Sequence, residues 1–155
     1  MALTFTYRLG EYGWAEAHLS DEVHTLVGTV SYLHDTVTNI VEAALSLLLD
    51  PATPQRIVFM DEPGELQLLL TPATDGSVDV VLRWYDDWES WGMHPEYQFK
   101  LVWETTTNAV NFAQIVKKVL DDLWMKYGAE HYKARWLEHD FPISLHEKLN
   151  CILAE

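Results

Sequence analysis

The chain has 155 residues, of which 48% are hydrophobic and 12% aromatic, and its formal net charge at pH 7 is −14. This length and apolar content predict a single globular domain over residues 1–155 and argue against a disordered chain. The charge argues against direct contact with nucleic acid and against an anionic membrane surface, because both would repel the protein. Residues 1–105 hold 17 acidic and 4 basic side chains, so the excess charge belongs to this part of the chain.

Alternating apolar and polar side chains predict three strands at the start of the chain, over residues 3–9, 14–19 and 23–32. A turn at residues 21–22 would place Ala17 opposite Leu26 in the second hairpin. The same register sets Ala15 opposite Gly28. These small side chains would form a face on which a helix can lie closely.

A helix is predicted over residues 35–49. Asp35 suits its first position, because the carboxylate accepts hydrogen bonds from the free amides of the first turn and complements the helix dipole. Apolar residues follow at helical spacing, and Pro51 stops the helix. The chain then returns as a strand over residues 56–61, with a turn after it.

The next two strands, over residues 66–70 and 78–85, read as a hairpin. A three-residue loop at residues 74–76 would carry glycine at the position that needs a positive φ. This loop sets Leu68 opposite Leu82 and brings both apolar rows onto one sheet face. We therefore prefer it to a two-residue turn, which would shift one row relative to the other.

After a loop at residues 89–95, a further strand is predicted over residues 97–103. Its alternating apolar side chains are Tyr97, Phe99, Leu101 and Trp103. The period of two predicts that these four side chains share one buried face, with polar residues between them on the other face.

Three helices complete the chain. The first runs from the polar residues 105–108, which offer several caps, to Gly128, a residue type suited to ending a helix. A second helix is predicted over residues 129–137. The last helix is predicted to begin at Ser144, whose hydroxyl would cap it while Glu147 reaches back in a capping box.

Together these elements predict an α+β fold. We expect a largely antiparallel sheet of about six or seven strands, in the order βββα-ββββ-ααα, with helices packed on one face. The other face of the sheet would stay partly exposed to solvent or to a partner.

The sequence contains no motif for nucleotide binding or nucleophilic catalysis, so it predicts no catalytic residue, no cofactor and no metal. His146 and Glu147 begin like a zinc-protease motif, yet Asn150 stands where the second ligand would be. Cys151 is the only cysteine, which favours a reducing compartment, and its apolar neighbours predict a buried, inert thiol. With no secretory signal and no membrane-spanning run, we expect a cytoplasmic protein.

The least ordinary stretch interleaves tryptophans with carboxylates and contains Asp86, Asp87, Trp88, Glu89 and Trp91. Large aromatic rings supply contact area in protein interfaces, and acids steer a basic partner towards them. The sequence therefore predicts a non-enzymatic protein-binding module for a basic partner, of the kind found in immunity proteins or antitoxins. A solvated acidic face is the alternative interpretation of the same residues.

Two other functions stay open at this level. A small-molecule site or enzyme pocket between the sheet and the helices would use His94, His139 and Asp140, with Trp91 as an aromatic wall. A self-associating structural protein would instead form a homo-oligomer through the uncovered sheet face or a sheet edge.

Overall fold

The structure is a computed structural model, which describes residues 3–155. Its elements are, in chain order, β1 (Thr4–Leu9), β2 (Trp14–Ser20), β3 (Thr25–Ser31), α1 (Thr36–Leu49), β4 (Gln55–Met60), β5 (Glu65–Pro72), β6 (Ser77–Tyr85), the short 3-10 helix η1 (Glu89–Trp91), β7 (Lys100–Asn108), α2 (Ala109–Trp136) and α3 (Ile143–Leu153). Gly128 interrupts α2 with a φ of 66°, so two helical segments meet there as predicted. The α+β class and the order βββα-ββββ-ααα are confirmed.

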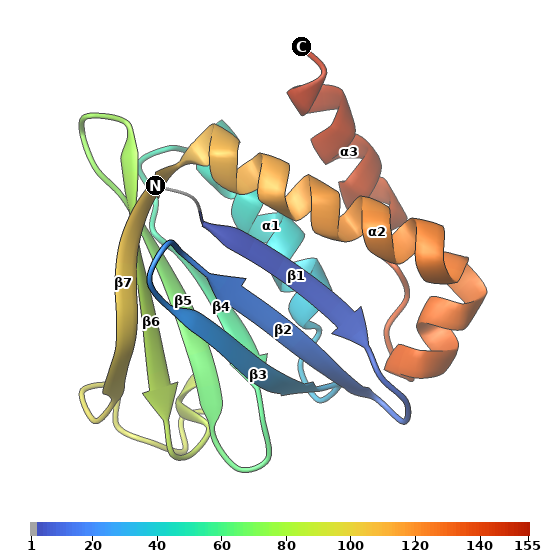
Figure 1. Cartoon of the computed structure of the whole chain (residues 1–155), viewed down its shortest axis with the longest axis horizontal. Coiled ribbons are helices and arrows are strands. Elements are labelled where there is room, and N and C mark those ends of the chain that lie inside the picture. Colours follow the sequence, from blue (N-terminus) through green and yellow to red (C-terminus); the bar gives the residue numbers. More distant parts are fainter. Residues whose placement is uncertain (1–2) are drawn as a thin grey trace.

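The strands form two antiparallel sheets, with strand orders β1-β2-β3 and β4-β5-β6-β7. Side chains join the sheets where β3 passes β4. Thr29 Oγ1 donates to Asp61 Oδ2 at 2.9 Å, and Ser31 Oγ donates to Glu62 Oε2 at 2.8 Å. Figure 1 shows the helices on one side of this arrangement, where α1 contacts β4 and α2 contacts β1.

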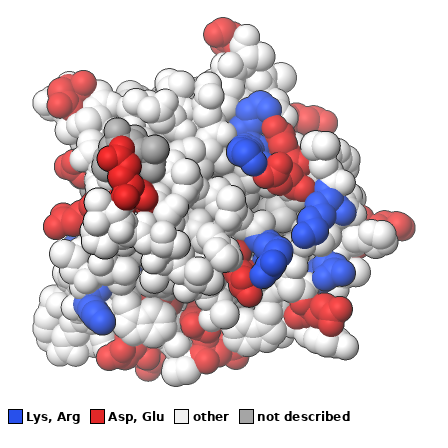
Figure 2. All heavy atoms as spheres, viewed as in Figure 1, with Lys and Arg blue, Asp and Glu red and all other residues white. Residues whose placement is uncertain are grey.

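Charges are distributed unevenly over the surface. On the face shown in Figure 2, lysine and arginine side chains gather on the side where Figure 1 places α2, interspersed with acids. Acidic side chains line the lower edge of the same view, below the ends of the second sheet. The arrangement matches the sequence, in which acids greatly outnumber bases before residue 106.

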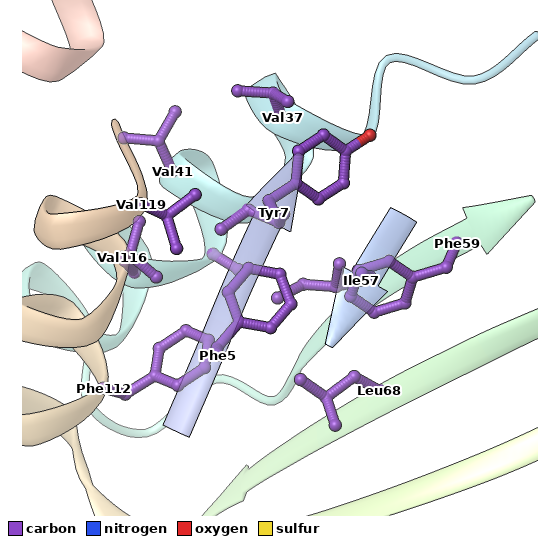
Figure 3. Close-up of a cluster of buried hydrophobic side chains, with 14 of the residues drawn as sticks. Phe5, Tyr7, Val37, Val41, Ile57, Phe59, Leu68, Phe112, Val116 and Val119 are labelled. Carbon is purple, nitrogen blue, oxygen red and sulfur yellow. The ribbon is translucent and has the colours of Figure 1, made fainter. Parts of the chain in front are cut away.

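The core lies between the sheets and the helices. Figure 3 shows Phe5 of β1, Ile57 of β4 and Phe112 of α2 pointing into one cluster. All three are buried, and the rings of Phe5 and Phe59 lie 5.9 Å apart. Their burial removes apolar surface from water and ties helices to both sheets.

Two local predictions are confirmed in detail. The β5–β6 hairpin pairs Leu68 with Leu82, and Gly76 takes a φ of 89° in the connecting loop. The Asp35 carboxylate caps α1 by accepting a hydrogen bond from the Thr38 amide at 3.4 Å. Both features depend on residues that are close in sequence, which is why the pattern predicted them.

The predicted register of the β2–β3 hairpin is wrong by two residues. Ala17 lies opposite Gly28, because the Asp21 carboxylate accepts from the amides of Val23 and His24 and holds a longer turn. A shift of two leaves the buried face unchanged. Gly28 then lies against a strand instead of a helix, since an added Cβ would stand 2.8 Å from Leu66 Cδ1.

The predicted strand at residues 97–103 begins too early, since β7 starts at Lys100. A bulge changes its register, so that Trp103 pairs with Leu82 but Leu101 pairs with Arg83. The extra residue places Leu101 on the sheet face opposite to the buried Trp103. Leu101 is accordingly 48% exposed, and residues 97–99 precede the strand.

Two predictions for the C-terminal helix are also wrong. The helix begins at Ile143, after Pro142, so Ser144 lies inside its first turn and forms no capping box. Cys151 is exposed, because α3 turns His146 and Leu149 towards the protein instead. The helical spacing of Leu149 and Cys151 places them on different sides of α3.

Candidate functional site

The segment over residues 86–99, which we call the aromatic loop, folds back over the outer face of the second sheet. Two aromatic side chains anchor it through their polar atoms. The buried Tyr85 hydroxyl donates to the Glu96 carbonyl at 2.8 Å, and Trp88 Nε1 donates to the Asp61 carbonyl at 2.8 Å. The sheet face that we expected to be exposed is therefore partly covered by this loop.

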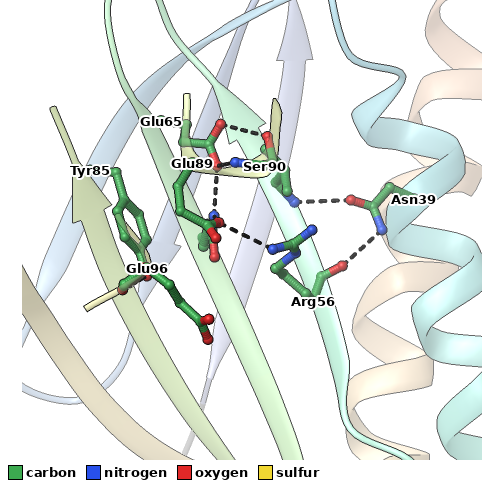
Figure 4. A network of polar contacts seen from close by, with 9 residues as sticks. Asn39, Arg56, Glu65, Tyr85, Glu89, Ser90 and Glu96 are labelled. Carbon is green, nitrogen blue, oxygen red and sulfur yellow. Dashed lines mark hydrogen bonds and ion pairs between the residues drawn. The ribbon is translucent and has the colours of Figure 1, made fainter. Parts of the chain in front are cut away.

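A buried carboxylate holds the centre of the aromatic loop. Glu65 of β5 is fully buried and accepts hydrogen bonds from the Ser90 amide at 3.1 Å and the Ser90 hydroxyl at 2.7 Å. It also accepts one from Gln67 Nε2 at 2.6 Å. Figure 4 shows this network, in which Glu65 and Ser90 face each other across the outer side of the sheet.

Glu89 belongs to the same network. Its carboxylate accepts from Gln67 Nε2 at 2.7 Å and from Arg56 Nη1 at 3.2 Å, and its side chain is only 12% exposed. The single amide group of Gln67 thus bridges two carboxylates, while Arg56 supplies the positive charge. Of the five residues predicted to bind a partner, Glu89 is the one whose charged group points inward.

The two predicted tryptophans differ in exposure. Trp88 is half-buried, whereas Trp91 is 51% exposed, and their ring centroids lie 4.9 Å apart at an interplanar angle of 66°. Trp88 is fixed by its hydrogen bond to Asp61, so it supports the Trp91 ring from one side. Trp91 is therefore held at the surface by packing.

A depression of about 410 Å³ lies between Trp91 and the polar side of α1. It is lined by Asn39 and Glu42 of α1, by the α1 cap Asp35 and by Arg56 of β4. Asn39 anchors α1 beside this strand, since its amide donates to the Arg56 carbonyl at 3.0 Å. Positions 35, 39 and 42 share one helix face by their spacing, but the sequence pattern singled out only Asp35, as the cap of α1.

Asp86 and Asp87 stand at the start of the aromatic loop. Asp86 is exposed and accepts from Trp84 Nε1 at 2.8 Å, while Asp87 Oδ1 accepts from the Trp88 amide at 2.7 Å. Each carboxylate thus has one internal donor, and the half-buried Asp87 and exposed Asp86 still meet solvent. Asp86 therefore contacts the Trp84 side chain, whereas Asp87 contacts the backbone of Trp88.

Further apolar side chains are exposed along the aromatic loop and the start of β7. They are Met93, Tyr97, Phe99 and Leu101. The Arg83 guanidinium lies 4.0 Å from the centre of the Phe99 ring, which orients this ring without burying it. The sequence pattern wrongly assigned Tyr97, Phe99 and Leu101 to a buried strand face. The nearby Gly92 and Pro95 were the residues that could have indicated a longer loop.

The residues of the predicted pocket lie in different places. His94 packs against the Tyr85 ring, with the ring centroids 5.9 Å apart. His139 Nε2 lies 2.7 Å from the Tyr32 carbonyl, and Asp140 pairs with Lys133 at 3.1 Å. Within residues 3–155, no hydrogen bond, ion pair or ring contact joins His94 to the other two.

A separate group of buried polar atoms lies near the start of α1. The hydroxyls of Tyr7 and Tyr132 and the Trp136 indole N–H have no hydrogen-bond partner within the described part of the chain. Burial raises the pKa of both tyrosines, and the nearby Asp35 charge raises them further. Both phenols are therefore neutral at physiological pH.

Across the described residues, no group of three or more potential metal ligands comes together, and no helix has the length and apolar character needed to cross a membrane. Comparison with protein-family models, with curated proteins and with solved structures finds no match for this chain. The aromatic loop and its surroundings are therefore the features of the molecule that indicate a function.

Proposed function

We propose that the protein is a non-enzymatic binding module for a basic protein partner, acting as an immunity protein or antitoxin acts on its target. The aromatic loop and the depression beside Trp91 would form the contact surface. The observation that carries this proposal is the exposed, internally supported Trp91 ring, which stands beside Asp35 and Glu42.

The exposed half of Trp91 offers substantial binding energy. A buried tryptophan removes roughly 150–250 Å² from water, so covering half of it contributes roughly 2–3 kcal/mol at about 25 cal/mol per Å². Tryptophan is also among the residue types that dominate binding energy in protein interfaces. A lysine or arginine stem laid on this ring would bring its charge to the α1 carboxylates.

The anchoring of the aromatic loop favours binding as well. Ser90, Trp88 and Tyr85 each use hydrogen bonds to hold the loop on the sheet before any partner arrives. A surface that is already ordered loses less conformational entropy on binding, so more of the contact energy appears as affinity.

The net charge of −14 favours a partner with a net positive charge. Acids near the contact surface attract a basic protein over several ångströms and increase the association rate, and salt screens this attraction. We prefer this function to a small-molecule pocket between sheets and helices, because side chains such as Phe5 and Phe112 occupy that space. We expect the protein to act in the cytoplasm.

The test is affinity capture from the source cell at low and high salt, followed by mass spectrometry. We expect a stoichiometric basic protein that is recovered at low salt and released at high salt. Trp91→Ala should reduce its recovery at least tenfold. Trp124→Ala, at a 42% exposed tryptophan of α2, is the matched control and should leave recovery unchanged. Equal recovery of the basic protein with both variants would refute the assignment of the contact surface to Trp91.

A further inference from the structure

An open groove lies between the two sheets, at the ends of the strands that are joined to the aromatic loop. Its volume is about 480 Å³, and its walls come from β3 on one side and from β5, β6 and β7 on the other. Its apolar lining residues are Leu26, Val27, Leu66, Trp84, Leu101 and Val102. The groove is thus an apolar surface that neither sheet covers.

Glycines determine the shape of this groove. At Gly28 the backbone of β3 lies directly on Leu66, where a Cβ would be 2.8 Å from Leu66 Cδ1. At Gly64 a Cβ would be 2.6 Å from the Trp84 ring, so this indole packs onto bare backbone. Beyond these close contacts the walls are open, and Val27 and Leu101 are 54% and 48% exposed.

Trp84 is held in one orientation by two groups. Its ring packs against Gly64, and its Nε1 donates to the Asp86 carboxylate at 2.8 Å. An aromatic side chain that is fixed in this way presents a prepared apolar surface to the groove. A ligand that packs on it therefore loses little entropy in ordering the site.

The charges at the groove favour a basic ligand. Asp61 lines the groove, Asp86 holds the Trp84 indole, and the exposed Glu62 follows Asp61 in the chain. Among the lining residues, all of which lie in the described part of the chain, Asp61 is the single acid and Lys100 the single base, so the excess of acids comes from Glu62 and Asp86 at the edge of the groove. These acids lie around an apolar groove and have the same sign as the net charge of the protein. A complementary ligand would therefore carry positive charges on either side of an apolar group.

Two aspartates link the groove to the aromatic loop. Asp61 accepts from Trp88 through its carbonyl and also lines the groove, and Asp86 connects the aromatic loop to Trp84. Because this inference rests on the proposed function, its test must separate the two surfaces.

We propose that the groove between the sheets binds an apolar side chain flanked by lysine or arginine residues, in an extended segment of the basic partner. The apolar side chain packs on Trp84 between the strand walls. The flanking bases lie at the groove mouth near Asp61 and Asp86. The aromatic loop provides contact area next to this anchor.

Nuclear magnetic resonance titration of the tryptophan indole N–H signals tests the proposal with a defined probe. The probe is an acetylated, amidated pentapeptide with phenylalanine between two pairs of lysines. Trp84→Phe identifies the Trp84 signal, and Trp91→Phe identifies the Trp91 signal. We expect a saturable shift of the Trp84 signal, at least tenfold weaker binding when glycine replaces phenylalanine, and no binding when glutamates replace the lysines.

Two exposed valines of the same hairpin provide matched variants. Val27→Arg places a long cation at the groove wall, whereas Val23→Arg makes the same change in the turn, at an 82% exposed position. We expect Val27→Arg to weaken peptide binding at least tenfold and Val23→Arg to leave it within twofold. Thermal unfolding of both variants checks that each is folded.

The possible failures are distinguishable. A shift of the Trp91 signal without one at Trp84 refutes the groove and leaves the proposed binding function standing. Equal affinity for the lysine and glutamate peptides refutes the charge selection. No saturable shift at millimolar peptide also refutes the groove, while affinity capture with the Trp91 variant judges the proposed function separately.

Discussion

Replacement of Glu65 by alanine probes the contact that holds the aromatic loop. The carboxylate is fully buried and accepts three hydrogen bonds, two from Ser90 and one from Gln67. The variant keeps the strand but removes every one of these acceptors. The amide and hydroxyl of the half-buried Ser90 and one N–H of the buried Gln67 would then lose their acceptor.

The expected cost is substantial but limited. Each hydrogen bond to a charged group contributes about 1.5–3 kcal/mol, so three would sum to several kcal/mol if the rest of the protein stayed rigid. Two effects reduce this sum: the desolvation cost of Glu65 disappears, and the loop can lift so that Ser90 reaches water. We therefore expect a loss of roughly 3 kcal/mol in the free energy of unfolding.

Urea unfolding at pH 7, followed by tryptophan fluorescence, measures the global effect, and hydrogen exchange of the Ser90 amide measures release of the loop. Glu65→Gln keeps one acceptor oxygen and should cost roughly 1–2 kcal/mol. Glu104→Ala is the control, because it removes an exposed acid from β7 of the same sheet, and it should change the free energy of unfolding by less than about 0.5 kcal/mol.

The result that would refute this reasoning is a Glu65→Ala protein with wild-type stability and a still protected Ser90 amide. The loop would then be held by its aromatic contacts alone. If the loop is released as expected, the variant should also lose affinity for a partner, because Trp91 would no longer be supported at the surface.

Three further outcomes follow from single residues. Tyr132→Phe should leave the free energy of unfolding unchanged or raise it by up to about 1 kcal/mol, since its buried hydroxyl has no hydrogen-bond partner among residues 3–155; a loss of more than about 1 kcal/mol would reveal a partner. Burial raises the pKa of the Asp121 carboxyl, but Lys117 and His146 lower it more, so its pKa lies below the usual value. The ionised carboxylate should therefore stabilise the fold above about pH 4, and this stabilisation should be lost as the pH falls through the pKa of the folded state. Comparison of Asp121→Asn with wild type between pH 6 and about pH 2.5 should give a stability difference that shrinks with acid, and a constant difference would contradict the linkage. Gly128→Ala should lower the free energy of unfolding by about 1–3 kcal/mol, because the φ of 66° and ψ of −179° at this position strain any residue with a Cβ, even though the space around it is open. Thermal or urea unfolding measures this loss, and an unchanged midpoint would show that α2 relaxes at the kink.

Several features were determined by the sequence alone because they depend on near neighbours. Asp35 caps α1 through the amide of a residue three positions away. Gly76 permits the loop that sets Leu68 opposite Leu82, and Gly128 interrupts α2. In each case the residue type and its spacing select one backbone conformation before any distant part of the chain is considered.

Tertiary structure decided the features that involve distant segments. Glu65 and Gln67 follow the pattern of a solvent-facing strand side, yet both are buried because residues 86–99 cover them. That contact also turns Glu89 inward and leaves Trp91 outward, beside Glu42 of α1. The alternation of a strand reports which side a residue faces, but whether that side meets water depends on what the rest of the chain places over it.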